Sequence, residues 1–454
     1  MNADRFDAVI VGAGVGGEVA IGNLAGAGLR IAVVERELIG GECAYWACMP
    51  TKTLLRPPEA RAESVRAAGV STPALQWSRV SEYRDWMIRG LDDAKQVRRY
   101  QERGIEVVKG AAQLAGPGRV AVNGRTLETD RIVLATGSDP VVPRIDGLAV
   151  AGYWTNREAT TMRRVPRSAV VIGGGPVGIE LALILHRFGA KTTIIQSADR
   201  LIDREDPKVG ELIQRALGEE GITVLTGRHA TSARREQDGR VVVLEDGQEV
   251  RGEVIVIGAG RRPRLAGLGL DAVGLDGSAG RVPIDERCRA EEGIWAIGDL
   301  TGISLFTHVA KYHGRIASAD ILGESATADY RAIPRVVFSD PEIAAVGQTE
   351  RRARAAGIDL ASATIDLAEA IARPYTYEET PRGTLTLHAD RTRQVLVGAW
   401  AVAPLASEWI HYAALAIRAE VPIGVLKDTV AQFPTYTEGF LSAVRRLDLG
   451  QQTT

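Results

Sequence analysis

Short, continuous runs of apolar residues alternate along the chain with stretches of helical periodicity. Such runs occupy residues 7–11, 31–35, 168–172 and 254–257, and each leads into a glycine-rich or polar turn. Continuous apolar runs of this length are typical of parallel strands that are buried on both faces. The alternation therefore predicts an α/β fold built from parallel sheets.

The first run leads into a G-x-G-x-x-G turn that opens a predicted helix over residues 18–27. This motif between a strand and a helix is typical of dinucleotide binding. Gly12 permits the tight turn, Gly14 lets the backbone approach a pyrophosphate, and Gly17 lets helix and strand pack closely. The next strand ends at Glu35, which is placed to accept a hydrogen bond from a ribose. A glycine-rich turn in a generic α/β sheet is the alternative.

The run at 168–172 leads into a second G-x-G-x-x-G turn, formed by Gly173, Gly175 and Gly178. This internal repeat predicts two Rossmann-like domains, one for FAD and one for a nicotinamide cofactor. The second strand of the repeat ends at Gln196, where an acid would indicate NAD. Glutamine can bind a ribose hydroxyl and does not repel a 2′-phosphate, so the choice between NAD and NADP stays open.

Composition and charge are those of an ordinary globular protein. The 454 residues are 45% hydrophobic and 25% charged, and a chain of this length should form about two to four domains. The formal net charge is −2, so neither nucleic acid nor an anionic membrane is expected as a partner. No apolar run reaches the roughly 18 residues of a membrane span, and no signal peptide is visible, so the expected location is the cytoplasm.

Two of the three cysteines, Cys43 and Cys48, follow the first nucleotide-binding pattern directly, and Lys52 comes one helical turn later. If a helix begins here, its amino-terminal dipole favours a thiolate and the spacing allows a short disulfide. The spacing does not fit a zinc ribbon and no second pair exists, so no metal site is expected. A flavin beside a redox disulfide is predicted, with two ordinary buried cysteines as the alternative. Cys288 is interpreted as structural or incidental.

Other segments add elements to this fold. Residues 79–103 predict a packed surface helix, and the Asn-Gly turn within 119–128 predicts a hairpin. A strand ends at Asp299, where an acid can bind the hydroxyls of a ribityl chain. From about residue 332 the pattern changes to antiparallel strands with a helix over 406–419, which predicts a separate α+β domain.

Together these motifs make the chain resemble the pyridine nucleotide–disulfide oxidoreductases of the lipoamide dehydrogenase, glutathione reductase and mercuric reductase type. The resemblance covers essentially the whole chain through Gly12–Gly17, Gly41–Lys52, Ala135–Gly137, Gly173–Glu180, Gly260–Pro263, Ala296–Asp299 and Phe338–Gly347. It implies a FAD-binding domain over 1–149 and 265–331, a NAD(P)-binding domain over 150–264, and a C-terminal dimerisation domain over 332–454. The last would complete the active site of the partner subunit.

The resemblance also implies a ping-pong mechanism, in which electrons pass from NAD(P)H through FAD to a Cys43–Cys48 disulfide. Cys48 would be the thiol against the flavin and Cys43 the one that exchanges with substrate. Lys52 would lie by the reactive ring nitrogen of the flavin and pair with Glu180. Further cofactor contacts are implied for Gly41, Ala112, Thr136, Gly137, Asp299 and Gly260.

The chain departs from the disulfide-reducing members in one segment, where they carry a His-Pro-Thr sequence that supplies the acid–base histidine. Here the histidine position is Phe433, which cannot move a proton, and such help is typically worth about 10²–10⁴ in rate. Mercuric reductase also has Phe-Pro in this region but carries a carboxy-terminal cysteine pair, which this sequence lacks. Glu438 and Tyr436 are alternative proton donors. His411 is a further candidate, although a lone histidine on a helix is more often structural.

The predicted function is a FAD-dependent NAD(P)H oxidoreductase that passes electrons through the disulfide to a disulfide substrate. The alternative is a reductase of a quinone, a metal ion or a dye, for which the missing histidine matters less. A flavin-bearing binding protein is a third reading, disfavoured because both cysteines and Lys52 are present. The expected partners are a small-molecule electron acceptor and a second copy of the chain.

Overall fold

The computed structural model describes residues 4–450. Residues 1–3 and 451–454, which the predicted first and last domains include, lie outside the described residues. The chain forms two compact units. The first contains the residues up to 51 together with 82–141 and 260–329, and the second contains 52–81, 142–259 and the residues from 330 onward.

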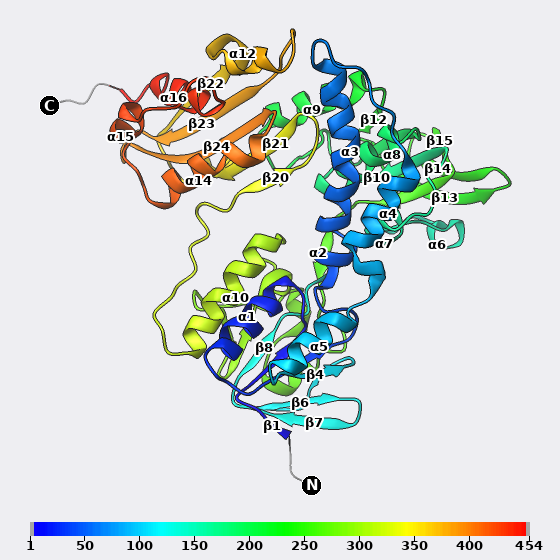
Figure 1. The fold of residues 1–454 in the computed structure, drawn as a ribbon, viewed down its shortest axis with the longest axis vertical. Helices are drawn as coiled ribbons and strands as arrows, with labels where there is room; N and C mark the ends of the chain where they lie inside the picture. The colour runs from blue at the N-terminus through cyan, green and yellow to red at the C-terminus, as the bar shows by residue number, and fades with distance from the viewer. Residues whose placement is uncertain (1–3, 451–454) are drawn as a thin grey trace. The chain divides into compact units, whose positions relative to one another are not determined.

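The centre of the first unit is a six-stranded sheet with the order β18-β19-β8-β2-β3-β4, parallel except at β18. Its strands are β2 (Ala8–Val11), β3 (Ile31–Glu35), β4 (Glu106–Lys109), β8 (Ile132–Leu134), β18 (Arg289–Glu291) and β19 (Ile294–Ala296). Helices α1 (Val15–Gly26) and α10 (Thr307–Ile321) lie side by side and pack against one face of this sheet (Figure 1).

Both faces of this sheet are buried, which explains the continuous apolar runs in the sequence. Ala8 and Ile10 face the core that contains α1 and α10, whereas Val9 and Val11 face a second core. Successive strand residues point to opposite faces, so every residue of β2 must be apolar to bury both faces. The predicted strands and the parallel α/β class are therefore confirmed.

A smaller sheet of the first unit contains the predicted hairpin. Its strands, in the order β1-β7-β6-β5, are β1 (Asp4–Arg5), β5 (Gln113–Leu114), β6 (Arg119–Val122) and β7 (Arg125–Glu128). Between β6 and β7, Asn123 has φ 50° and Gly124 has φ 76°. Two consecutive left-handed residues form the hairpin turn that Asn-Gly favours, so this prediction is confirmed.

The prediction of a single helix over residues 79–103 is wrong. The segment forms α4 (Trp77–Met87), a short 3-10 turn η1 (Arg89–Leu91) and α5 (Ala94–Glu102). The chain leaves the helical conformation at Arg89, Gly90 and Leu91, all of which have φ between 55° and 61°. Each of the two helices still buries apolar residues, so the periodicity continues across a break that it cannot reveal.

The second unit contains a four-stranded parallel sheet with the order β12-β11-β10-β16. Its strands are β10 (Ser168–Ile172), β11 (Lys191–Gln196), β12 (Thr223–Thr226) and β16 (Val254–Ile257), and α8 (Pro176–Arg187) and α9 (Pro207–Glu219) are its helices. The order β10–α8–β11 repeats β2–α1–β3 of the first unit. A three-stranded antiparallel sheet, β13 (Ala230–Glu236), β14 (Gly239–Leu244) and β15 (Glu249–Gly252), adjoins it.

The carboxy-terminal part of the second unit is an antiparallel five-stranded sheet with the order β20-β21-β24-β23-β22. It consists of β20 (Arg335–Val337), β21 (Glu342–Gly347), β22 (Leu360–Asp366), β23 (Thr384–Asp390) and β24 (Val395–Ala403). This part includes the helices α13 (Ala406–Trp409), α14 (His411–Arg418), α15 (Ile423–Asp428) and α16 (Thr437–Arg445). The predicted α+β region is confirmed, although the helix predicted over 406–419 is divided between α13 and α14.

The remaining elements connect these layers. They are α2 (Gly41–Tyr45), α3 (Cys48–Arg66), α6 (Leu148–Ala151), α7 (Asn156–Thr160), α11 (Glu350–Ala355), α12 (Leu367–Ala370), β9 (Ser138–Pro140), β17 (Arg261–Pro263) and the 3-10 turns η2 (Leu270–Val273), η3 (Gly277–Ala279), η4 (Gly298–Thr301) and η5 (Arg373–Thr376). Among residues 4–450, no helix combines the length and apolar character needed to cross a bilayer.

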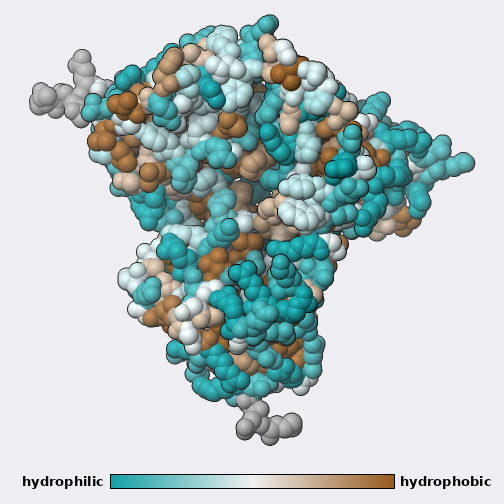
Figure 2. Space-filling model, in the orientation of Figure 1, coloured by the Kyte–Doolittle hydropathy of each residue, from teal (hydrophilic) through white to brown (hydrophobic). Residues whose placement is uncertain are grey.

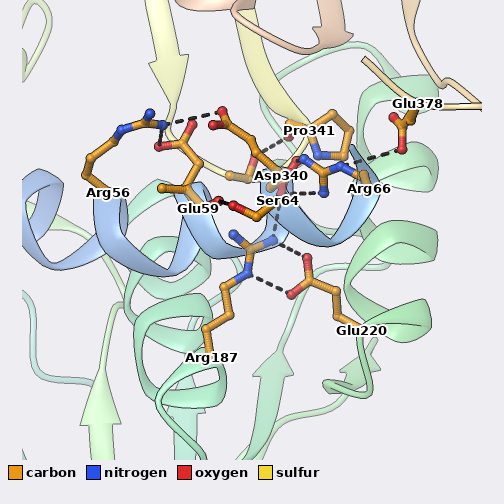
Figure 3. Close-up of polar contacts among 12 residues, drawn as sticks. Arg56, Glu59, Ser64, Arg66, Arg187, Glu220, Asp340, Pro341 and Glu378 are labelled. Carbon is orange, nitrogen blue, oxygen red and sulfur yellow. Dashed lines mark hydrogen bonds and ion pairs between the residues drawn. The ribbon is translucent and has the colours of Figure 1, made fainter. Parts of the chain in front are cut away.

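A partly buried ionic cluster links three parts of the second unit (Figure 3). Asp340 accepts hydrogen bonds at 2.9 Å from Arg66 on α3 and from Arg187 on α8. Arg187 also binds Glu220, and Arg66 lies 3.5 Å from Glu378. Burial alone would raise the pKa of Asp340, but the two guanidinium groups outweigh burial and hold that pKa below its ordinary value. The cluster fixes the segment that precedes β21.

Candidate active site

The first G-x-G-x-x-G turn leaves the amino terminus of α1 open. Gly12 has φ +102°, and a Cβ there would lie 2.4 Å from the carbonyl oxygen of Ala135. A Cβ on Gly17 would lie 2.1 Å from the carbonyl oxygen of Gly12, so both positions require glycine. A Cβ on Gly14, which caps α1, would meet nothing within 4 Å. The exposed backbone at this helix terminus fits the pyrophosphate of FAD.

Glu35 holds the first turn in place from the end of β3. Its carboxylate accepts a hydrogen bond of 2.7 Å from the backbone N–H of Ala13 and another of 2.7 Å from that of Glu37. The side chain is buried, yet an ionised carboxylate can accept further hydrogen bonds beyond these two. Its position and remaining acceptor capacity fit the ribose of the dinucleotide.

The cysteine segment runs directly against this turn. The N–H of Gly40 donates a hydrogen bond of 2.8 Å to the carbonyl oxygen of Ala13. Gly41 has φ +60°, and a Cβ there would lie 2.9 Å from the Cα atom of Gly14. The two backbones are too close for any side chain, which explains the glycine at position 41. The following helix α2 therefore starts beside the nucleotide-binding turn.

Cys43 and Cys48 both belong to the first unit, where Cys43 lies in α2 and Cys48 is the first residue of α3. Both side chains are half-buried, and Cys48 Sγ lies 3.2 Å from Thr307 Oγ1. The amino terminus of a helix favours negative charge, so the position of Cys48 favours a thiolate. Within residues 4–450, no group of three or more His, Cys, Asp or Glu side chains is arranged to hold a metal ion.

Cys288 has a different environment from the other two cysteines. It is fully buried in the core beside α10, and burial raises the pKa of its thiol to about 12. A buried thiol with so high a pKa forms almost no thiolate near neutral pH and is chemically inert. This agrees with the structural role expected for Cys288.

The ends of β8 and β19 place the next expected cofactor residues. Thr136 follows β8, and its hydroxyl donates a hydrogen bond of 3.0 Å to the carbonyl oxygen of Arg264. The carbonyl oxygen of Gly137 accepts a bond of 3.0 Å from the N–H of Arg264. Asp299 follows β19, and its carboxylate accepts a 2.5 Å hydrogen bond from Ser138. Burial raises the pKa of Asp299, so this carboxyl group holds a proton more readily than an exposed one.

Two other expected cofactor residues lie in the first unit. Gly260 has φ +111°, and a Cβ there would meet nothing within 4 Å, so its backbone is accessible. Ala112 follows β4 and packs against the core under that strand. Arg261, which belongs to the Gly260–Pro263 motif, donates to the Ser138 hydroxyl at 2.8 Å and thereby supports the bond from Ser138 to Asp299.

A buried histidine that the sequence did not reveal positions the Asp299 turn. His313 lies on α10, and its Nδ1 atom accepts a hydrogen bond of 3.1 Å from the N–H of Gly298. Burial lowers the pKa of His313 to about 4, so the ring is neutral and keeps this acceptor at physiological pH. A lone histidine in an amphipathic helix carries no sequence signal for such a contact.

The second G-x-G-x-x-G turn repeats the first in the second unit. Gly173 has φ +115°, and a Cβ on Gly178 would lie only 1.8 Å from the carbonyl oxygen of Gly173. Gly175 caps α8 and is open, as Gly14 is in the first turn. Gln196 ends β11 and accepts a hydrogen bond of 2.9 Å from the N–H of Gly174. This open helix terminus fits the pyrophosphate of a nicotinamide dinucleotide.

Lys52 and Glu180 form an ion pair in the second unit, with Lys52 Nζ 2.7 Å from Glu180 Oε2. Glu180 is buried, and its other oxygen accepts a bond of 3.0 Å from the N–H of Phe338. The ring of Phe338 lies 4.7 Å from Lys52 Nζ, which adds a cation–π contact. The ammonium group is therefore held in one position, and the pairing is the one that the resemblance implies.

The segment with Phe433 has no side chain that matches an acid–base histidine. Phe433 precedes a cis proline and is 76% exposed. Tyr436 is buried against Trp409, its hydroxyl has no hydrogen-bond partner among the described residues, and burial raises its pKa. Glu438 accepts a bond of 3.0 Å from the N–H of Thr435. His411 is exposed at the start of α14.

Hydrophobic side chains gather on the surface over α14 and α15 (Figure 2). Leu415 on α14 is 60% exposed, and Val425 on α15 is 55% exposed. Val430 and Phe433 continue this exposed apolar set. Such a patch on a protein surface is typical of a protein–protein interface.

Two dinucleotide-binding folds, a pair of cysteines beside the first and a fixed lysine–glutamate pair define a flavin- and nicotinamide-dependent disulfide oxidoreductase. The chain belongs to the pyridine nucleotide-disulphide oxidoreductase family, because residues 6–314 match that family and residues 333–444 match its dimerisation domain. The dimerisation domain supports a homodimer.

Several known proteins are similar to almost the whole of this chain. The chain is 32% identical over 455 residues to mercuric reductase from Bacillus cereus, covering 98% of this chain and 72% of that protein. It is 31% identical over 452 residues to dihydrolipoyl dehydrogenase from Thermus scotoductus, covering 97% of each. Among solved structures, the Cu(II) complex of the HOCl-induced flavoprotein disulfide reductase RclA from Escherichia coli has a TM-score of 0.87 at 26% identity, covering 98% of this chain and 99% of that one.

Family membership establishes the cofactors and the internal path of electrons. The protein uses FAD and NAD(P)H, and electrons pass from the nicotinamide through the flavin to the redox disulfide. The predicted family, fold class and oxidoreductase activity are therefore confirmed.

Proposed function

We propose that the terminal electron acceptor is a metal ion that binds thiolates, with Hg(II) and Cu(II) as the cases to test. The observation that carries this proposal is Phe433, which stands where disulfide-reducing relatives supply an acid–base histidine. Similarity to proteins named mercuric reductase and to a Cu(II)-bound flavoprotein reductase supports the same choice.

The chemistry of the two kinds of acceptor differs in its need for protons. Reduction of a disulfide by Cys43 expels a thiolate, and protonation of that leaving group by a general acid is typically worth about 10²–10⁴ in rate. The phenyl ring of Phe433 has no proton to give. A metal ion needs none, because the Cys43 thiolate binds it as a soft ligand, and the two sulfurs return to the disulfide as two electrons pass to the metal. One Hg(II) or two Cu(II) ions balance this step.

The two alternative proton donors are poorly suited to the task. Tyr436 is 5% exposed, and its raised pKa makes proton release still harder. The carboxylate of Glu438 already accepts the N–H of Thr435, which closes the turn before α16. Their environments therefore favour structural roles for both residues.

The remaining residue roles follow the family pattern and form part of the proposal. Cys43 would meet the acceptor, Cys48 would face the flavin, and Lys52 with Glu180 would favour negative charge on the reduced ring. FAD would be bound within 1–149 and 265–331 by Gly12, Gly14, Gly17, Glu35, Gly41, Ala112, Thr136, Gly137 and Asp299. The nicotinamide cofactor would be bound within 150–264 by Gly173, Gly175, Gly178, Gln196 and Gly260 at its border. Residues 332–454 would form the dimer.

A second candidate acceptor is a small disulfide. Glu438 lies three residues after Thr435 in the same turn as Phe433, and its carboxyl group would serve as the acid if that turn opened. Either acceptor fits a cytoplasmic enzyme, because NAD(P)H is available there and thiols are kept reduced.

The test compares acceptors under anaerobic conditions with NADH and with NADPH. We expect NAD(P)H oxidation with Hg(II) or Cu(II), loss of that activity in Cys43→Ser, and slow turnover with lipoamide or glutathione disulfide. Phe433→His should raise disulfide turnover by about 10² or more, and Phe433→Leu should leave it slow. Fast disulfide turnover by the unmodified protein, unaffected by Phe433→His, would assign the disulfide substrate instead.

A further inference from the structure

The sulfur of Cys48 lies at the meeting point of two helix amino termini in the first unit. Cys48 is the first residue of α3, and Thr307 is the first residue of α10. The Thr307 hydroxyl oxygen lies 3.2 Å from Cys48 Sγ, although the two residues are 259 positions apart in sequence. The contact therefore exists only because the fold brings both helix starts together.

The electrostatic setting favours negative charge on this sulfur. The first-turn N–H groups of a helix have no partner within the helix and carry partial positive charge. Neither α3, with 19 residues, nor α10, with 15 residues, has an acidic residue in its first turn. No carboxylate of either first turn therefore competes with the sulfur for this positive potential.

The direction of the hydrogen bond depends on the state of the sulfur. When Cys48 is a thiol, either atom can be the donor. A thiolate has no hydrogen, so the bond persists only if the Thr307 hydroxyl donates to Sγ. Hydrogen bonds to charged acceptors are stronger than neutral ones, so ionisation of Cys48 strengthens this contact. The hydroxyl thus favours the thiolate over the thiol.

We propose that Thr307 is a catalytic residue that stabilises the Cys48 thiolate by hydrogen bonding during electron transfer from the flavin to the disulfide. The two sulfurs of the reduced protein then differ: Cys48 remains a thiolate, while Cys43 is available to the acceptor. This inference concerns the internal electron path and holds whichever acceptor Cys43 meets.

The hydroxyl of Thr307 has no capping function in its own helix. Phe306 is the N-cap residue of α10, and no side-chain hydrogen bond caps that terminus. The helix is held to the core by Val309, Ile316 and Ala317, which are all buried. Replacing the hydroxyl by a methyl group in Thr307→Val therefore preserves the shape of the side chain and the packing of α10.

The test measures the pKa of Cys48 in the flavin-bound protein, in a Cys43→Ser background. Alkylation of Cys48 by iodoacetamide is followed against pH by mass spectrometry, and the thiolate–flavin charge-transfer absorbance is titrated in parallel. Cys288 does not interfere, because burial raises its pKa to about 12. We expect Thr307→Val to raise the Cys48 midpoint by about one pKa unit, a tenfold loss of thiolate below the midpoint, and Thr307→Ser to restore it.

A second variant and a control for bound flavin separate the proposed role of Thr307 from a merely structural one. Thr307→Ala provides a second variant without the hydroxyl, so the comparison survives if the valine variant loses its flavin. Alkylation is scored only in protein that retains flavin absorbance. The proposal is overturned if the Val and Ala variants titrate like the parent protein. Thr307 variants that keep Cys43 are assayed for metal-ion reduction in parallel. Loss of that activity with an unchanged Cys48 titration would likewise count against Thr307 acting through the thiolate.

Discussion

The two G-x-G-x-x-G turns have nearly the same backbone but differ in the charge beside it. A Cβ on Gly12 or on Gly173 would lie 2.4 Å from a carbonyl oxygen of the neighbouring strand end. In each turn the residue that ends the next strand accepts a backbone N–H: Glu35 at 2.7 Å and Gln196 at 2.9 Å. Backbone sterics thus fix the turn, whereas one side chain decides whether a carboxylate or a neutral amide lies at the proposed ribose site.

The surroundings of the two turns also differ. A Cβ on Gly41, in the cysteine segment, would lie 2.9 Å from Gly14 of the first turn. The second turn is covered by an ordinary loop instead, and the N–H of Ile202 donates to the carbonyl oxygen of Gly174 at 3.0 Å. One scaffold therefore has two different surroundings: the first turn lies beside the proposed redox cysteines, and the second is the proposed site of the electron donor.

The largest expected effect comes from filling the close contacts within the turns. Gly17→Ala should yield colourless protein, because its Cβ would lie 2.1 Å from the Gly12 oxygen. Gly178→Ala should retain the flavin but bind NAD(P)H about 10- to 100-fold more weakly, since overpacking costs about 1–3 kcal/mol. Flavin absorbance and nicotinamide titration measure the two outcomes. Loss of flavin in both variants would show that the two folds are not independent.

Acidification should weaken the first fold through His313. Its pKa falls from 6.5 to about 4 on folding, so the unfolded chain binds the proton first. The stabilisation is complete above pH 6.5 and is lost as pH falls toward 4, by about 3 kcal/mol. Denaturant unfolding monitored by flavin fluorescence measures this change. His313→Gln should flatten the pH dependence in that window, whereas His411→Gln, at an exposed position, should leave it unchanged.

Exchanging the carboxylate of Glu35 and the amide of Gln196 should reverse the difference in charge between the two turns. Gln196→Glu places a carboxylate where a 2′-phosphate would bind, so kcat/KM with NADPH should fall about tenfold while that with NADH changes little. Glu35→Gln is the reciprocal variant and should weaken FAD binding without changing the nicotinamide preference. Equal losses for NADH and NADPH in Gln196→Glu would contradict the assignment of this position.

The smallest effect is a matched control within α1. Gly22 lies in the helix interior, and a Cβ there would meet nothing within 4 Å. Gly22→Ala should therefore raise the free energy of unfolding by about 0.5–1 kcal/mol, because alanine loses less backbone entropy in a helix. A destabilised variant, measured by urea unfolding, would show that α1 does not tolerate change even at its open positions.

Local sequence signals were sufficient for the elements whose cause is local. The strands β2 and β10 follow from burial on both faces, and the hairpin at Asn123 follows from its left-handed turn. The break at Arg89–Leu91 was missed because hydrophobic periodicity continues on both sides of it. Contacts between distant segments, such as Thr307 with Cys48 and His313 with Gly298, have no local signal and require the fold.

The resemblance to a family supplied what periodicity could not. Lys52 and Glu180 are 128 residues apart, and no spacing rule predicts their 2.7 Å ion pair. The same holds for residues 52–81, which pack in the second unit because Leu54 and Leu55 join the core of α8. A pair of apolar residues on a helix predicts that this face of the helix is buried, but it does not predict which other element covers that face.

The close passage of Gly41 over Gly14 has a consequence for protein engineering. Grafting the cysteine loop onto another nucleotide-binding scaffold would fail without the glycine at position 41, since a Cβ there would lie 2.9 Å from the Cα atom of Gly14. The unit to be transferred is therefore the two backbone segments in close contact, and not the two cysteines alone.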